Sequence, residues 1–303
     1  MNSILSFPER GNYGNSKWRG NCSGYVIREL LDFFRPQVFI DPACGSNTSG
    51  DVVRELNQKE GRDIEYFGFD LAQGFNLLRD SLLKAIGGAR CNYAFYHPPY
   101  MNIVRYSGEV WGQTPHPDDL SNCADYQDFL TKLAVSLENI YDCLTADGAF
   151  SVLIGDVRQK GVYYPLQADL VQLAPGTLDG IIIKTQHNCQ SDAKTYRGGK
   201  PFIPIQHEYI LNFRKNRLIV GILDNTLAIS RRLENLARAN WTKLVRIALE
   251  TCGGRNAPLQ QIYEVIERNA PQTVATRPNW QARVRATLQS NFQSSQRGLW
   301  SLA

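Results

Sequence analysis

A short motif with proline and aromatic residues follows the apolar run 92–96 directly, and its composition suits the binding of a planar ring that carries an amino group. Two successive prolines hold the backbone rigid and leave carbonyl groups outside any strand ladder. Such carbonyls accept hydrogen bonds from an exocyclic amino group, and an aromatic side chain can stack on a base taken out of a duplex. The motif consists of His97, Pro98, Pro99 and Tyr100.

A second motif, DPACGSNTSGD, joins the end of an apolar run to a segment with helical periodicity. Small residues in such a turn let backbone N–H groups approach a ligand closely. The segment has neither the GxGxxG pattern of a dinucleotide site nor the GxxxxGK pattern of a P-loop, which disfavours phosphate cofactors. Asp70 ends the next apolar run, where its carboxylate could accept hydrogen bonds from ribose hydroxyls. Asp80 is a third acidic candidate, either for recognition of an adenine amino group or as a helix N-cap.

These motifs together resemble those of amino-methylating DNA methyltransferases. DPACGSNTSG, Asp70 and HPPY occur in the order of the gamma arrangement of that family, KWRGNCSG resembles its additional cofactor motif, and HEYILNFRK resembles its closing strand. The resemblance covers about residues 13 to 215. It implies S-adenosylmethionine as cofactor, bound by Lys17, Trp18, Arg19, Gly20, Asn21, Asp41, Pro42, Ala43, Cys44, Gly45, Ser46, Asn47, Asp70, Leu71, Asp80 and Ser81.

The resemblance implies methyl transfer to adenine N6 of a flipped-out base in double-stranded DNA. Cytosine N4 is a close alternative, since the same pocket chemistry serves either amine, and adenine is preferred only on family likeness. RNA or protein-amide methylation is a further alternative. Covalent cytosine-C5 methylation needs a Pro-Cys nucleophile, and this dipeptide does not occur. No metal ion is required by this chemistry. A DNA-binding regulator built on an inactive methyltransferase body is an alternative from a different class.

His97 departs from the family pattern, which usually has Asp, Asn or Ser at the first catalytic position. A neutral imidazole offers a nitrogen acceptor, whereas a protonated one has only donors. We therefore expect activity to fall as the pH drops through the His97 pKa, ordinarily about 6.5, and flat activity down to about pH 5.5 would oppose this. Alternatively, the imidazole caps the sheet while backbone carbonyls bind the amine.

The elements expected to position these residues alternate between strand-like and helical patterns. Such alternation predicts a doubly wound, Rossmann-like α/β sheet covered on both faces, and the runs GIIIKTQH and HEYILNFRK predict a terminal β-hairpin. We expect a methyltransferase domain at residues 1–217, a helical connector at 218–240 and a winged helix-turn-helix domain at 241–303. The last rests on three short helical patterns and a strand-like tail.

Charge is concentrated near the C-terminus. The 303-residue chain has a formal net charge of +4, while residues 241–303 contain eight basic and three acidic side chains. This excess favours a polyanionic partner, although such small helical modules also serve protein contacts or dimerisation. A palindromic DNA site would suit a homodimer. The expected DNA-binding residues are Lys194, Arg197, Lys200, Asn279, Gln281, Arg283, Arg285 and Arg297.

The remaining composition is that of an ordinary globular protein, with 43% hydrophobic and 20% charged residues. No apolar run is long enough for a membrane span, and the N-terminus lacks the apolar core of a secretory signal. Seven scattered cysteines without a CxxC pair are interpreted as reduced thiols, with neither disulfides nor a metal site. We expect a cytoplasmic, nucleoid-associated protein of a bacterium or phage. No nuclease motif is found, so it would act alone or with a separate restriction enzyme.

Overall fold

The computed structural model describes residues 1–187, 203–215, 241–275, 277–296 and 298–302. The chain divides into two compact units, Met1–Lys215 and Asn216–Ala303, and each is described here by itself. The expected connector, 218–240, lies outside the described residues, as do the side chains of Lys194, Arg197, Lys200 and Arg297.

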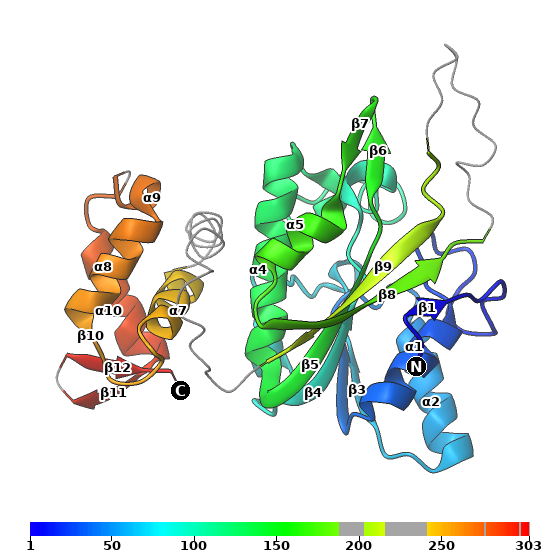
Figure 1. Cartoon of the computed structure of the whole chain (residues 1–303), viewed down its shortest axis with the longest axis horizontal. Helices are drawn as coiled ribbons and strands as arrows, with labels where there is room; N and C mark the ends of the chain where they lie inside the picture. The colour runs from blue at the N-terminus through cyan, green and yellow to red at the C-terminus, as the bar shows by residue number, and fades with distance from the viewer. Residues whose placement is uncertain (188–202, 216–240, 276, 297, 303) are drawn as a thin grey trace. The chain divides into compact units, whose positions relative to one another are not determined.

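The first unit is built on a seven-stranded mixed sheet (Figure 1). Its strand order is β1-β8-β9-β5-β4-β2-β3. Strands β2 to β5 pair in parallel, while β9 is antiparallel to both β5 and β8. The strands are β1 (Ile4–Leu5), β2 (Val38–Asp41), β3 (Glu65–Gly68), β4 (Cys91–Tyr96), β5 (Leu144–Ile154), β8 (Thr177–Thr185) and β9 (His207–Arg214). The expected α/β sheet with its terminal hairpin is confirmed, and β1 adds an edge strand that the sequence did not predict.

Helices cover both faces of this sheet (Figure 1). Residues of α1 and α2 pack with Phe39 and Ile210 on one face, and residues of α3, α4 and α5 pack with Phe150 and Leu211 on the other. In α1 the buried side chains recur at helical spacing, which explains how an 11-residue helix buries one stripe. The helices are α1 (Gly24–Phe34), α2 (Thr48–Glu60), α3 (Leu82–Ala85), α4 (Tyr126–Cys143) and α5 (Leu166–Leu173), and a hairpin of β6 (Val157–Gln159) and β7 (Val162–Tyr164) follows β5.

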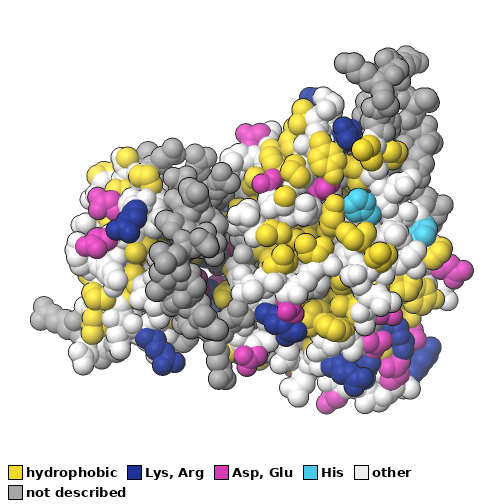
Figure 2. All heavy atoms as spheres, in the orientation of Figure 1, with side chains coloured by type: hydrophobic (Ala, Val, Ile, Leu, Met, Phe, Trp, Pro, Cys, Tyr) yellow, Lys and Arg dark blue, Asp and Glu magenta, His cyan; other side chains and the backbone are white. Residues whose placement is uncertain are grey.

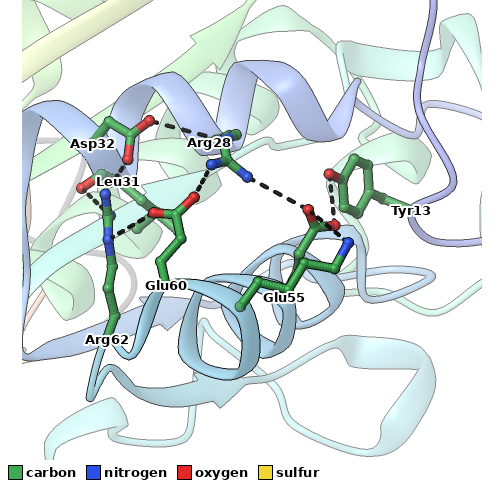
Figure 3. A network of polar contacts seen from close by, with 8 residues as sticks. Tyr13, Arg28, Leu31, Asp32, Glu55, Glu60 and Arg62 are labelled. Atoms are coloured by element: carbon green, nitrogen blue, oxygen red, sulfur yellow. Dashed lines mark hydrogen bonds and ion pairs between the residues drawn. The ribbon is translucent and has the colours of Figure 1, made fainter.

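An ionic network joins α1 to α2 and to the N-terminal segment (Figure 3). Arg28 on α1 forms ion pairs with Glu60 and, at 3.5 Å, with Glu55, both on α2. Glu55 also accepts a 2.9 Å hydrogen bond from the Tyr13 hydroxyl. The same region carries closely mixed basic and acidic side chains in Figure 2. The network therefore fastens α1 and Tyr13 to the middle and the end of α2.

The second unit contains the three predicted helices and a small antiparallel sheet. Helix α7 contacts both α8 and α10. The sheet order is β10-β12-β11, so the strand before α8 pairs with the last strand of the chain. The elements are α7 (Trp241–Thr251), β10 (Ala257–Pro258), α8 (Leu259–Asn269), α9 (Pro271–Ala275), α10 (Trp280–Asn291), β11 (Gln293–Gln296) and β12 (Leu299–Ser301).

Three further features concern the described residues alone. None of their helices is long and apolar enough to cross a membrane. They contain no cluster of three or more His, Cys, Asp or Glu side chains suited to a metal ion. Their six cysteines are free thiols, and Cys189 lies outside the described part of the chain.

Candidate functional site

The predicted motifs meet at one edge of the sheet because parallel strands end on the same side. Asp41 ends β2, Asp70 follows β3, and His97 follows β4. Strand β8 runs parallel to β5, because both are antiparallel to β9. The end of β8 and the start of β9 therefore lie at this edge as well, which brings Lys184 opposite Glu208 in the β8–β9 register.

A cavity of about 950 Å³, partly open to solvent, lies at the ends of β2, β3 and β4. Four carboxylates line it, Asp41, Asp70, Asp118 and Asp119, and no Lys or Arg is among the described lining residues. Its aromatic side chains are Trp18, Phe75, Phe95, Tyr96, Tyr106 and Trp111. We call it the acidic cavity. Its charge suits a cationic ligand with hydroxyl donors and opposes a phosphate group.

Asp41 and Asp70 both keep acceptor capacity for a ligand. Asp41 accepts from the Ser49 hydroxyl at 2.6 Å and from the Ala43 N–H at 3.2 Å, and Asp70 accepts from the N–H groups of Ala72 and Gly45, both at 2.9 Å. Burial raises the pKa of Asp41 to about 7, although these hydrogen bonds oppose the shift. Burial also raises the pKa of Asp70. A bound cation would favour the charged form of both carboxyls.

Gly45 allows Trp18 to cover the turn. Gly45 has φ +49°, and a Cβ atom built there would lie 2.8 Å from Trp18 Nε1. The segment with Trp18 is held by Asn21, whose Nδ2 donates to Ser46 Oγ at 2.8 Å and whose Oδ1 accepts from the Thr48 hydroxyl at 2.5 Å. The N-terminal motif and the glycine turn thus contact each other, and both line the acidic cavity.

A second, larger cavity of about 2300 Å³, again including open solvent, adjoins the acidic cavity. It contains the whole HPPY motif together with residues from β5, β6, β8 and β9. The two cavities share Gly20, Asn21, Cys22, His97, Pro99 and Tyr106. His97 therefore lies where a ligand in one cavity meets a ligand in the other. We call the larger space the substrate cavity.

A chain of hydrogen bonds links His97 to two charged residues of the terminal hairpin. Lys184 Nζ donates to Glu208 Oε2 at 2.6 Å, the Tyr100 hydroxyl donates to Glu208 Oε1 at 2.8 Å, and His97 Nε2 lies 2.9 Å from the Tyr100 hydroxyl oxygen. Burial raises the pKa of Glu208, but the Lys184 charge and hydrogen bonds outweigh it, so the pKa is lowered overall. Glu208 is thus a carboxylate at neutral pH, able only to accept.

The protons of this chain have one consistent arrangement. The Tyr100 hydroxyl uses its single proton in the hydrogen bond to Glu208. The Tyr100 oxygen can therefore only accept a hydrogen bond from His97, which comes from Nε2–H. A neutral His97 then carries no proton on Nδ1, which has no hydrogen-bond partner among the described residues. Burial lowers the pKa of His97 to about 4; the Glu208 charge opposes this shift, and the Lys184 charge reinforces it. The sequence predicts a fall in activity near the ordinary histidine pKa of about 6.5. With the lowered pKa of His97, this fall is expected near pH 4 instead.

The structure brings most, but not all, of the predicted cofactor residues to the acidic cavity. Asp80 and Ser81 are exposed and do not line it. The Asp80 carboxylate accepts from the Asn76 N–H at 2.8 Å, and Ser81 caps α3, so local turns use both side chains. The predicted residues that line the cavity are Trp18, Gly20, Asn21, Asp41, Pro42, Ala43, Cys44, Gly45, Ser46, Asp70 and Leu71, and those that do not are Lys17, Arg19, Asn47, Asp80 and Ser81.

The loop 105–123 contributes Trp111 to the lining of the acidic cavity and not to that of the substrate cavity. Its backbone is organised by the buried Asp119 carboxylate, which accepts from the Ser107 N–H at 2.8 Å and from the Ser121 N–H at 2.8 Å. Tyr106 of this loop lines both cavities and donates to the Arg19 carbonyl at 3.2 Å. Its aromatic residues therefore wall the predicted cofactor site.

Sequence reasoning missed Lys184, Glu208 and Gly155. A Cβ on Gly155 would lie 3.1 Å from the Tyr100 ring and 3.4 Å from Glu208 Cγ, so the glycine makes room for their hydrogen bond. One signal was available, because Glu208 is a charged residue within an otherwise apolar strand pattern.

No protein-family model matches the sequence, and no curated protein is similar to it at a significant level. Several solved structures are similar in fold. TrmN from Thermus thermophilus is 14% identical over 65% of this chain and 50% of that one, with a TM-score of 0.34. A proposed DNA modification methylase from the same organism, solved with S-adenosyl-L-methionine, is 23% identical over 46% of this chain and 51% of that one, with a TM-score of 0.28.

A proposed class I S-adenosylmethionine-dependent methyltransferase from Listeria monocytogenes is 15% identical over 65% of this chain and 60% of that one, with a TM-score of 0.36. The chain spans about half the length of the two Thermus proteins.

Proposed function

We propose that the protein transfers a methyl group from S-adenosylmethionine to adenine N6 of a base flipped out of duplex DNA. The observation that carries this proposal is the position and protonation of His97. Its Nδ1 is an unprotonated acceptor in a side chain shared by an acidic cavity and a cavity with the Pro98-Pro99 backbone. The family's usual side-chain oxygen acceptor is thereby replaced by a nitrogen acceptor of the same polarity.

The acidic cavity fits S-adenosylmethionine in charge and hydrogen-bonding capacity. The cofactor's ammonium and sulfonium groups are cationic, and four carboxylates line this cavity. Asp70 retains acceptor sites for ribose hydroxyls after it binds Gly45 and Ala72. Trp18, Phe75 and Trp111 supply apolar walls for an adenine ring. Asp41 and the close turn at Gly45 would hold the polar end of the molecule.

When bound, the cofactor supplies a methyl group already activated by the positive sulfur. The chain's own task is then to orient the acceptor nitrogen and increase its electron density. His97 Nδ1 and the carbonyl groups of the prolines accept hydrogen bonds from the two amino hydrogens, which directs the nitrogen lone pair toward the acidic cavity. The N–C bond would form as the sulfur–methyl bond breaks, and the proton then lost from the amino nitrogen would pass to solvent water.

Tyr100, Glu208 and Lys184 act through His97 in this account. The Tyr100 hydroxyl holds the imidazole by Nε2, and Glu208 keeps the Tyr100 proton away from His97. Lys184 keeps Glu208 ionised, because its ammonium lowers the pKa of that buried carboxyl. The three are positioning residues, and they select the imidazole tautomer that the reaction requires.

The C-terminal unit supports DNA as the substrate. Its order is helix, strand, helix, short helix α9, helix and hairpin, which is compatible with the winged helix-turn-helix module that we propose, and α10 would then be the recognition helix. Asn279, Gln281 and Arg283 are exposed at the start of α10 and could reach base edges, while Arg285 contacts the Tyr263 hydroxyl at 3.3 Å. We propose a nucleoid-associated enzyme of a bacterium or phage.

Incubation with labelled S-adenosylmethionine and duplex DNA, followed by digestion to nucleosides and mass spectrometry, tests the proposal. N6-methyladenine is the expected product. Label on cytosine N4 would keep the amine chemistry but change the base, and label on RNA or protein alone would overturn the DNA assignment. DNA binding without methyl transfer would identify a regulator on an inactive methyltransferase body.

A further inference from the structure

The substrate cavity contains two arginine side chains that form no ion pair with any residue in the described part of the chain. Arg10 and Arg158 both line this cavity, and both are half-buried. Arg10 Nη2 and Arg158 Nε are buried and make no hydrogen bond within the described parts of the chain. A charged group that has lost water without gaining a partner is costly. A ligand that brings acceptor oxygens would lower this cost.

The other half-buried arginines of the first unit show how this fold usually satisfies such groups. Arg28 and Arg62 are surrounded by carboxylates in the network of Figure 3. Arg62 also donates to the Leu31 carbonyl at 3.3 Å. Arg10 and Arg158 form no ion pair among the described residues, although they are buried to a similar degree. The contrast marks them as guanidinium groups that no carboxylate of the described residues compensates, so a ligand in the substrate cavity would meet them uncompensated.

Neither acidic residue of the described lining of the substrate cavity forms an ion pair with Arg10 or Arg158. Lys184 and Glu208 pair with each other at 2.6 Å. Asp156, the other acidic lining residue, accepts from the Tyr163 hydroxyl at 2.7 Å and from the Gln167 N–H at 3.2 Å. Arg158 stacks over the Tyr163 ring at 5.2 Å, which orients its guanidinium without supplying an anion. The described lining of the substrate cavity therefore has three basic and two acidic side chains, whereas that of the acidic cavity has four acidic and no basic ones.

We propose that Arg10 and Arg158 bind the phosphate groups that flank the target nucleotide. This inference rests on the proposed function and names the residues that hold the substrate's backbone. Guanidinium groups match phosphate oxygens in geometry and charge, and phosphate contacts fix the register of a nucleic acid without reading its sequence. The arginines share their cavity with His97 and Tyr100, so an extruded nucleotide would bring its base to the motif and its phosphates to the guanidinium groups.

The test measures DNA binding by the full chain with S-adenosylmethionine present, without requiring turnover. Fluorescence anisotropy of a labelled duplex with a mismatched adenine, which eases extrusion, is followed over a range of salt concentrations. Arg10→Gln and Arg158→Gln should each weaken binding about tenfold and reduce the salt slope by about one. Arg54→Gln is the matched control, because Arg54 is exposed and lines neither cavity. It should behave as the wild type.

A second change, in the DNA, tests whether each arginine contacts a phosphate. One phosphate beside the target adenine is replaced by a neutral methylphosphonate linkage. It should weaken binding by the wild type but have little further effect on the variant that has lost the matching arginine. Unchanged affinity and slope in both arginine variants would overturn the inference even if DNA is methylated. Arginine-dependent binding without methylation would retain the inference and reject the proposed activity. Absence of DNA binding by the wild type would reject both.

Discussion

The Tyr100 hydroxyl donates a 2.8 Å hydrogen bond to Glu208 Oε1, which joins the HPPY motif after β4 to strand β9. Because Tyr100 has only one hydroxyl proton, this bond decides which nitrogen of His97 is protonated. The relationship links a residue after β4 to one at the start of β9, 108 positions later. It gives a structural reason why histidine can occupy a position where an oxygen acceptor is usual.

Removal of the Tyr100 hydroxyl tests this relationship. Tyr100→Phe keeps the ring but frees His97 Nε2, so the imidazole tautomer is no longer fixed. We expect kcat to fall about tenfold, equivalent to about 1.4 kcal/mol, with the KM for S-adenosylmethionine unchanged. Tyr126→Phe is the matched control, since it loses a hydroxyl bond to Asp169 and lies outside both cavities. Equal effects of the two substitutions on kcat would contradict the assigned role.

The pH dependence of kcat reports the protonation of His97. Neutral imidazole is the active form, and burial lowers the His97 pKa to about 4. Activity should therefore remain level from neutral pH to about pH 5.5 and decline as the pH approaches 4, where Nδ1 becomes a donor. His97→Asn should lack this decline over the range in which circular dichroism shows the fold intact. A decline centred near pH 6.5 would show that His97 is not desolvated as described.

The buried Lys184–Glu208 pair should be sensitive to the loss of one partner alone. Lys184→Met leaves the Glu208 carboxylate buried without its cation, and we expect the free energy of unfolding to fall by about 3 kcal/mol. Adding Glu208→Gln to Lys184→Met should restore part of this loss, as measured by urea denaturation. Arg214→Gln, which breaks the exposed pair with Asp179, should change stability by less than about 0.5 kcal/mol. A double variant less stable than Lys184→Met would refute the pairing argument.

Gly45 in the predicted cofactor turn can be compared with Gly61, which lies after the end of α2, in a substitution test. Gly45 and Gly61 both have positive φ angles, of +49° and +66°, but only Gly45 faces an indole ring. Gly45→Ala should raise the Kd for S-adenosylmethionine at least about tenfold, because its methyl group displaces Trp18 from the cavity wall. Gly61→Ala should cost about 1 kcal/mol of stability without affecting the Kd. Isothermal titration calorimetry distinguishes the two, and equal Kd values would show that the acidic cavity does not bind the cofactor at this turn.

Much of the fold and the local motifs followed from the sequence. The turn 41–47, Asp70 and HPPY each end a strand, and parallel strands bring such ends to one edge whatever the details of packing. The Tyr100–Glu208 bond could not be derived in this way. It depends on the register of β8 and β9 and on the space at Gly155, both of which are properties of the assembled sheet.

Asp80 is a residue that the sequence suggested for the cofactor site but that does not line the acidic cavity. Its sequence position suited either cofactor recognition or a local cap, and a carboxylate in a polar turn often satisfies nearby N–H groups first. The structure gives it the Asn76 N–H, and its side chain is exposed outside the acidic cavity. Arg10 and Arg158 were also beyond prediction, because the sequence does not show which side chains surround a guanidinium group.

Single-turnover methyl transfer by His97 variants tests the central claim most directly. With S-adenosylmethionine and DNA saturating, His97→Asn should keep most of the wild-type rate, because its amide oxygen can accept from the target amine. His97→Ala should lose about a hundredfold, the range found for loss of a well-placed polar group in an active site. Equal rates for His97→Ala and the wild type, with both variants folded and binding the cofactor normally, would contradict the account.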